Sequence, residues 1–222
     1  MTTTKQQYPM TTGIETLRGL PESILRLRND AEIELIDIKL VLSLLNNAIT
    51  ILTTIEFMEI LREHGMIDEK EEQELTRSLL GKSPSENGYD LCGHNFVAEV
   101  KCYTPIDDSG FGSNQKKGIK RDIYNLWLGK NNVVVKDKNK FMVFLGDYND
   151  LKFKKGIMSI VSAKYKEKDK TKDIHIKFDY FYNYTNFRNL PKDKIIMVVI
   201  HPSEITFKKL NDVVNSYQHS VP

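Results

Sequence analysis

The sequence predicts an α/β (α+β) fold with a helical N-terminal portion, and three observations predict it. Between residues 21 and 81, apolar residues recur at three- and four-residue spacings, which is typical of helices. From Tyr89 onward, apolar and polar residues alternate with a period of two, which is typical of strands. Two continuous apolar runs, 141–145 and 195–200, have the length of buried central strands. This order indicates a mixed central sheet flanked by helices.

The chain divides into a short leading segment and one domain. We expect residues 1–20, rich in Thr, Gly and Gln, to be flexible. Residues 21–222 then form a single domain, which is of ordinary size for one hydrophobic core. Within it, 21–81 is the helical portion and 82–222 is the sheet-containing core.

Local signals set the expected helix boundaries in the N-terminal portion. Pro21 suits the first turn of a helix, and Gly65 suits the residue just after a helix end. Asp68, with Glu71 three residues later, predicts the N-cap of a short helix that ends at Gly81.

The sheet portion begins with a hairpin. Strands are expected at 89–92 and 96–103, joined by a tight turn at 93–95. The Gly-, Asp- and Ser-rich residues 104–114 predict a loop, and 115–128 predict an amphipathic helix with a basic start.

Charge is unevenly distributed along the 222 residues, although the net charge is only +2. Residues 1–110 contain 10 Lys and Arg against 19 Asp and Glu, whereas residues 111–222 contain 22 against 11. The basic half is suited to an acidic partner, of which nucleic acid is the commonest. The two halves could instead simply attract each other.

Several protein classes are excluded by composition. Two cysteines, Cys92 and Cys102, are too few for a disulfide scaffold or a multi-Cys zinc module. The N-terminal residues have no apolar core of a secretion signal, and the apolar stretch 40–55 is interrupted by Ser, Asn and Thr. We therefore expect a cytoplasmic protein with no membrane span.

The chemistry-bearing residues lie in the predicted hairpin. A two-residue turn at His94 and Asn95 would place Asp90 directly opposite Glu99, with Cβ atoms roughly 5 Å apart. Lys101 shares the face of Glu99, because residues two apart in a strand point the same way. Two carboxylates this close repel unless a proton or a cation lies between them, and Mg²⁺ is a suitable cation.

Asp90, followed after eight residues by Glu99-Val100-Lys101 between apolar strands, resembles the active-site signature of the PD-(D/E)XK nuclease superfamily. Tyr89 stands where the name-giving proline would be. The resemblance covers roughly residues 88–146, and it implies a restriction-endonuclease-like fold with an αβββαβ core.

The resemblance also implies roles for these residues. Asp90 and Glu99 would ligate Mg²⁺, or Mn²⁺ as a substitute, together with the backbone carbonyl of Val100. Lys101 would position the attacking water. The implied activity is that of a metal-dependent endodeoxyribonuclease of the type II restriction-like kind that acts on DNA, and the implied assembly is a homodimer.

Members of this superfamily often add further residues from two helices. Glu56 or Glu59 could supply an extra metal ligand from the helix before the hairpin. Gln115, with Lys117 or Lys120, could join the site from the helix after it.

Basic and aromatic residues in the second half suggest nucleic-acid contacts. Four basic residues crowd the start of the helix at 115–128 and could neutralise backbone phosphates: Lys116, Lys117, Lys120 and Arg121. The aromatic-rich run 178–184 could stack unpaired bases, but its period of two favours a packed strand face.

Other interpretations fit the same residues. Glu99 and Lys101 could lie on the solvated face of an edge strand, and Gln115 could simply begin a helix. The main alternative function is a non-catalytic nucleic-acid-binding module on the same fold. A third is an interaction protein that uses its charge asymmetry for assembly alone.

Overall fold

The computed structural model describes residues 13–29, 35–81, 88–106, 108, 110–166, 173–206, 209–213 and 215. Within them, the three N-terminal helices are α1 (Gly13–Asn29), α2 (Leu35–Glu63) and α3 (Glu69–Gly81). The first hairpin consists of β1 (Leu91–Cys92) and β2 (Phe96–Lys101), and α4 (Ser113–Leu128) and β3 (Asn139–Leu145) follow it. The remaining elements are α5 (Leu151–Val161), β4 (Tyr165–Lys166), β5 (Asp173–Ile174), β6 (Phe178–Tyr180), three short 3₁₀ turns (Phe181–Asn183, Phe187–Asn189 and Pro202–Glu204) and β7 (Ile195–Ile200).

A mixed five-stranded sheet forms the centre, in the order β1-β2-β3-β7-β6, and this confirms the predicted α and β class. Strands β2, β3, β7 and β6 are parallel, and β1 runs antiparallel to β2. A separate two-stranded ribbon pairs β4 with β5. The predicted apolar runs become β3 and β7, which are internal strands of the sheet.

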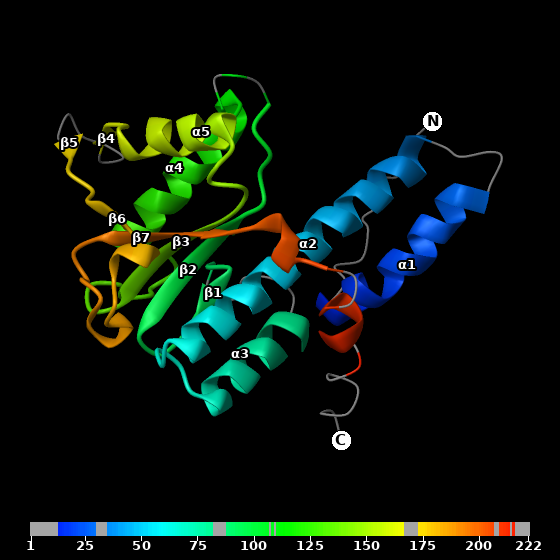
Figure 1. Cartoon of the computed structure of the whole chain (residues 1–222), viewed down its shortest axis with the longest axis horizontal. Coiled ribbons are helices and arrows are strands. Elements are labelled where there is room, and N and C mark those ends of the chain that lie inside the picture. Colours follow the sequence, from blue (N-terminus) through cyan, green and yellow to red (C-terminus); the bar gives the residue numbers. More distant parts are fainter. Residues whose placement is uncertain are drawn as a thin grey trace.

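Helices cover both faces of the sheet, with α2 and α3 on one face and α4 and α5 on the other (Figure 1). The side chains of β2 therefore alternate between two cores. Phe96, Ala98 and Val100 face the α2 and α3 side, and Val97 faces the α4 and α5 side. Because both faces are covered, no face of β2 is solvated as an edge strand would be.

The core on the α2 side joins the helical portion to the sheet. Phe57 of α2 and Phe96 of β2 contact Phe141 of β3 edge-to-face, with ring centroids 5.2 Å and 6.0 Å from it. Phe181 also contacts Phe141, with ring centroids 6.3 Å apart. These rings are almost fully buried, so the helical and sheet portions share one core.

The N-terminus differs from the prediction. Helix α1 already begins at Gly13, so residues 13–20 are not a flexible segment, and Pro21 lies inside the helix rather than in its first turn. Ile14, Leu17 and Leu20 explain the difference, because their spacing of three buries all three against α2 and α3. Residues 1–12 lie outside the described residues.

Other boundaries follow the predicted signals. Gly65 has a φ of +67° and ends α2 in a Schellman-type cap, in which Met66 N–H donates to the Leu61 carbonyl. Asp68 caps α3 by accepting a 2.8 Å hydrogen bond from Glu71 N–H. Helix α5 was not predicted, because its first residues read as part of a lysine-rich stretch.

One described helical stretch, 38–63, is 26 residues long with a mean hydropathy of 1.6, which is enough by length and composition to cross a membrane. Core helices of water-soluble proteins pass the same test. Phe57, Met58 and Leu61 in this stretch are core residues, and 28% of its most apolar window is buried.

Because Phe141 is the centre of the aromatic cluster, Phe141→Ala should lower the free energy of unfolding by about 3–5 kcal/mol, measured by chemical denaturation. Val134→Ala is the control, since Val134 is 74% exposed and should change stability by less than about 0.5 kcal/mol. Equal effects of the two changes would contradict the assigned core.

Candidate active site

The hairpin positions the first acidic residue as the sequence predicted. Leu91 pairs with Ala98 and Cys92 with Val97, which is the register of a two-residue turn at His94 and Asn95. Continued by one residue, this register sets Asp90 opposite Glu99. The Asp90 carboxylate accepts a 2.7 Å hydrogen bond from Val100 N–H, so it is held against β2.

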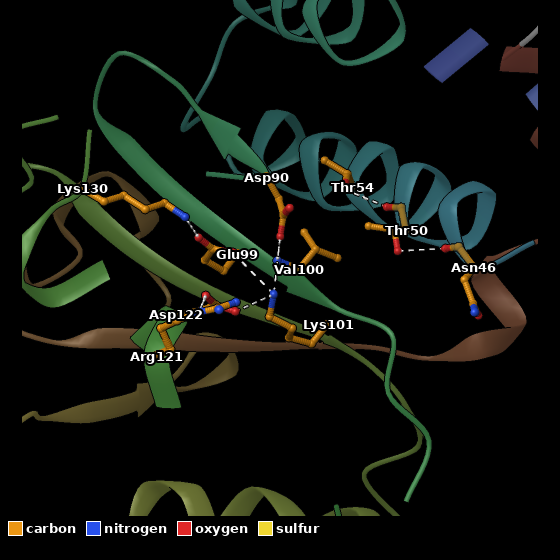
Figure 2. Close-up of polar contacts among 10 residues, drawn as sticks. All are labelled: Asn46, Thr50, Thr54, Asp90, Glu99, Val100, Lys101, Arg121, Asp122 and Lys130. Atoms are coloured by element: carbon orange, nitrogen blue, oxygen red, sulfur yellow. Dashed lines mark hydrogen bonds and ion pairs between the residues drawn. The ribbon is translucent and has the colours of Figure 1, made fainter. Parts of the chain in front are cut away.

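Three carboxylates surround the Lys101 amine (Figure 2). Lys101 Nζ lies 2.9 Å from Asp122 Oδ2, 3.5 Å from Glu99 Oε2 and 3.9 Å from Asp90 Oδ2. The structure thus brings together Asp90, Glu99 and Lys101, which the sequence singled out. It adds Asp122 of α4, which sequence reasoning missed.

A second lysine reaches Glu99 from the opposite side. Lys130, just after α4, lies 2.5 Å from Glu99 Oε1 and 4.5 Å from the centre of the Tyr89 ring. Arg121 lies at the rim, 3.5 Å from Asp122. The cluster therefore contains three carboxylates and two close ammonium groups. The attraction between opposite charges offsets the free-energy cost of removing each charge from water.

Asp122 and Lys130 leave different signals in the sequence. Asp122 falls between Ile119 and Ile123 on the buried stripe of α4, where an aspartate needs a partner. That signal could have been found. Lys130 stands among exposed loop residues, and only the folded chain brings it to Glu99.

Burial changes the protonation of these groups. Glu99 is 3% exposed, and this burial, helped by the charge of Asp90, raises its pKa from 4.5 to about 7 despite Lys101 and Lys130. Burial by itself would lower the pKa of Lys101, but Asp90, Glu99 and Asp122 outweigh it and raise that pKa. Lys101 therefore carries a positive charge.

The cluster opens on a cavity of about 500 Å³. Asp90, Val100 and Lys101 line it from the hairpin, Asn46 and Thr50 from α2, and Gln115 from α4. Gln115 also begins its helix as a capping residue, because its Oε1 accepts a 2.9 Å hydrogen bond from Gly112 N–H. The two interpretations of Gln115, helix start and site residue, are thus compatible.

Glu56 and Glu59 do not join this cavity. Both carboxylates bind the Lys209 amine, Glu59 at 2.7 Å, on the side of α2 that meets the C-terminal helical residues. The helix residues at the cavity are Asn46 and Thr50, which precede Glu56 by ten and six residues. This contact also shows that part of the charge asymmetry is neutralised within the chain.

The basic residues of α4 follow the cavity residue Gln115 in the sequence, and they differ in exposure. Lys117 and Arg121 are exposed, whereas Lys116 and Lys120 are half-buried. All four lie in the first three turns of the helix that carries Gln115 and Asp122.

The oxygen donors suit a hard divalent cation. Asp90 and Glu99 both approach the Lys101 amine, so a cation near this point could take a carboxylate oxygen from each. The Val100 carbonyl can add a third ligand, since the N–H and C=O of one strand residue point to the same side and its N–H faces Asp90. In the described residues, however, no group of three His, Cys, Asp or Glu side chains is arranged as a metal site.

Comparisons with known proteins add nothing to this geometry. No protein-family model matches the sequence, and neither the search of curated proteins nor that of solved structures gave a match.

The raised pKa of Glu99 predicts a pH-dependent stability. Between pH 4.5 and about 7, the folded protein holds a proton on Glu99 that the unfolded chain releases, so stability falls as pH rises. Without metal, the free energy of unfolding should decline by up to roughly 3 kcal/mol across this window. Denaturant titrations at pH 5 and pH 8 measure it.

Glu99→Gln is the matched variant, because it keeps the shape and removes the proton equilibrium. It should lose most of this decline. A decline of equal size in the variant would show that Glu99 does not ionise in this window.

Proposed function

We propose that this protein is a Mg²⁺-dependent endonuclease that hydrolyses phosphodiester bonds in DNA, with a restriction-endonuclease-like fold. One observation carries the proposal. Asp90 and Glu99, which fit a nuclease signature in the sequence together with Lys101, both approach the Lys101 amine, and Asp90 and Lys101 line one open cavity. A structural ion pair would not need an open face beside it.

The topology supports the proposed fold as well as the site. The hairpin that carries the signature is followed by α4 and by a strand parallel to β2, which is similar to the second half of the αβββαβ core. Two strands rather than three precede α4 in the described part of the chain.

In the proposed mechanism, Asp90, Glu99 and the Val100 carbonyl would hold the metal. When bound, Mg²⁺ would polarise the scissile phosphate and lower the pKa of a coordinated water. The Lys101 ammonium donates hydrogen bonds and so orients the attacking water and offsets the negative charge that develops on the phosphate. Because it is charged, it is not the base that accepts the water proton.

Asp122 and Lys130 act through other residues. Asp122 holds the Lys101 amine at 2.9 Å, and Lys130 holds one oxygen of Glu99. We infer that they are positioning residues, which fix the direction of the amine and of the carboxylate.

The bond changes are those of simple hydrolysis. The water oxygen forms a bond to phosphorus, and the bond from phosphorus to the 3′ oxygen breaks. The 3′ oxygen takes up a proton, and the products are a 5′-phosphate and a 3′-hydroxyl.

A non-catalytic nucleic-acid-binding module is the second candidate, and one observation favours it. Lys101 and Lys130 already pair with the two oxygens of Glu99 within the chain, so this carboxylate has cationic partners without a metal. Turnover and metal binding separate the two candidates.

Purified protein should nick or cut plasmid DNA in the presence of Mg²⁺ and lose this activity with chelator. Lys101→Ala and Asp90→Ala should each lower the rate at least about a hundredfold, because each removes a group that acts on the reacting phosphate. Lys70→Ala is the control, since Lys70 is exposed on α3 and pairs only with Glu74 in the described residues. Full activity of Asp90→Ala would overturn the mechanism.

Mn²⁺ titration by calorimetry tests the metal site separately. Glu99→Gln should abolish binding, whereas Glu56→Gln should leave it unchanged, because Glu56 binds Lys209 instead. Binding should also weaken below about pH 7, where a proton competes for Glu99. Loss of binding in Glu56→Gln with retention in Glu99→Gln would contradict the assignment.

A further inference from the structure

Three tyrosine rings contact one another at the free edge of the sheet, where Tyr148 and Tyr180 are half-buried and Tyr182 is exposed. Tyr180 ends β6, and its ring stacks on Tyr182 with centroids 5.4 Å apart and planes at 28°. Tyr148, after β3, meets Tyr180 edge-on at 5.9 Å. Tyr182 is 69% exposed, so the outer ring presents an open face to solvent.

This arrangement divides the aromatic run that the sequence predicted to be a packed strand face. Phe181 is buried in the α2-side core, and Phe178 packs on the α4 and α5 side. Tyr182 is directed away from both. The period of two does not continue past Tyr180, because residues 181–183 form a 3₁₀ turn.

Cations accompany the rings. Lys154 of α5 lies over the Tyr148 ring, 5.3 Å from its centre, and Lys155 beside it is exposed. The nearest carboxylate of the strand, Asp179, is engaged by Lys194 at 2.8 Å and by the Tyr184 hydroxyl at 2.6 Å. These partners therefore offset the repulsion that Asp179 would exert on the phosphate of a bound nucleotide.

The tyrosine surface lies level with the candidate active site. Tyr180 pairs with Met197, Met197 with Met142, and Met142 with Glu99. These four residues share one face of the sheet, and three strand spacings correspond to roughly 14 Å. Met142 and Met197 are buried under α4 and α5, so the register sets the height of the two regions along the strands and not a path between them.

We propose that Tyr148, Tyr180 and Tyr182 form a platform on which the bases of single-stranded nucleic acid stack. Aromatic faces with adjacent lysines bind unpaired bases of any sequence, whereas the bases of a duplex keep their faces covered. As a statement about the substrate, this rests on the proposed nuclease function. It means that the strand presented to Asp90, Glu99 and Lys101 is unpaired beside the cut.

Binding without cleavage tests the platform. Fluorescein-labelled 20-nucleotide oligo-dT and a 20-base-pair duplex are titrated with full-length protein in EDTA, and anisotropy gives the Kd. Tyr182→Ala should weaken oligo-dT binding fivefold or more, since each stacked base contributes about that much. Tyr182→Phe, which keeps the ring, should bind as the wild type does, and duplex binding should not change.

Three results would overturn the platform. These are no oligo-dT binding by the wild type, equal binding by Tyr182→Ala, and tighter binding of a proline-rich peptide, which tyrosine surfaces can also accept. Circular dichroism of Tyr182→Ala checks that the variant is folded. Lys154→Ala is a second test of the platform: it should weaken oligo-dT binding, and the loss of affinity should become smaller at high salt.

These outcomes are distinct from failure of the proposed function. Mg²⁺-dependent cutting of plasmid DNA by the wild type, together with unchanged oligo-dT binding by Tyr182→Ala, would remove the platform and leave the nuclease. Oligo-dT binding through Tyr182 without turnover under Mg²⁺ or Mn²⁺ would keep the platform and remove the nuclease.

Discussion

The buried carboxylate of Glu99 is the constraint on which the rest of this site depends. It projects from an internal strand of a sheet covered on both faces, where an unpaired charge would cost several kcal/mol. Lys101 and Lys130 bind one oxygen each, and Asp122 then balances Lys101. The result is a chain of alternating charges that ties β2 to α4 and to the residues after it.

The fold explains why this cluster remains accessible despite its burial. Strand β1 has two residues, so the sheet ends beside Asp90 and leaves the cavity between the hairpin, α2 and the start of α4. The covering helices divide their tasks. Helix α2 supplies apolar packing at Phe57 and polar side chains at Asn46 and Thr50, while α4 supplies Gln115 and Asp122 to the same region. Burial therefore decreases across the cluster, from Glu99, which is buried, to Asp90, which lies at the rim.

Charge along the chain acts in two ways. Lys209 pairs with Glu56 and Glu59, so basic residues of the second half partly neutralise acidic residues of the first. Lys152 of α5 pairs with Asp108 in the same way. Lys154 of α5 instead lies over the Tyr148 ring, at the tyrosine surface proposed here to meet nucleic acid. The uneven distribution of charge along the sequence thus has two consequences: ion pairs within the chain and exposed basic residues on the surface.

The sequence by itself determined the class of fold, the internal strands β3 and β7, the caps at Gly65 and Asp68, and the hairpin register that, continued by one residue, sets Asp90 opposite Glu99. Each depends on periodicity or on the geometry of a few neighbouring residues, which the local sequence contains. Only the tertiary structure decided that α1 begins at Gly13, that Glu56 and Glu59 turn to Lys209, and that Asp122 and Lys130 complete the charge cluster. Those outcomes depend on which distant segments come into contact, and burial against a partner is a property of packing that no local pattern specifies.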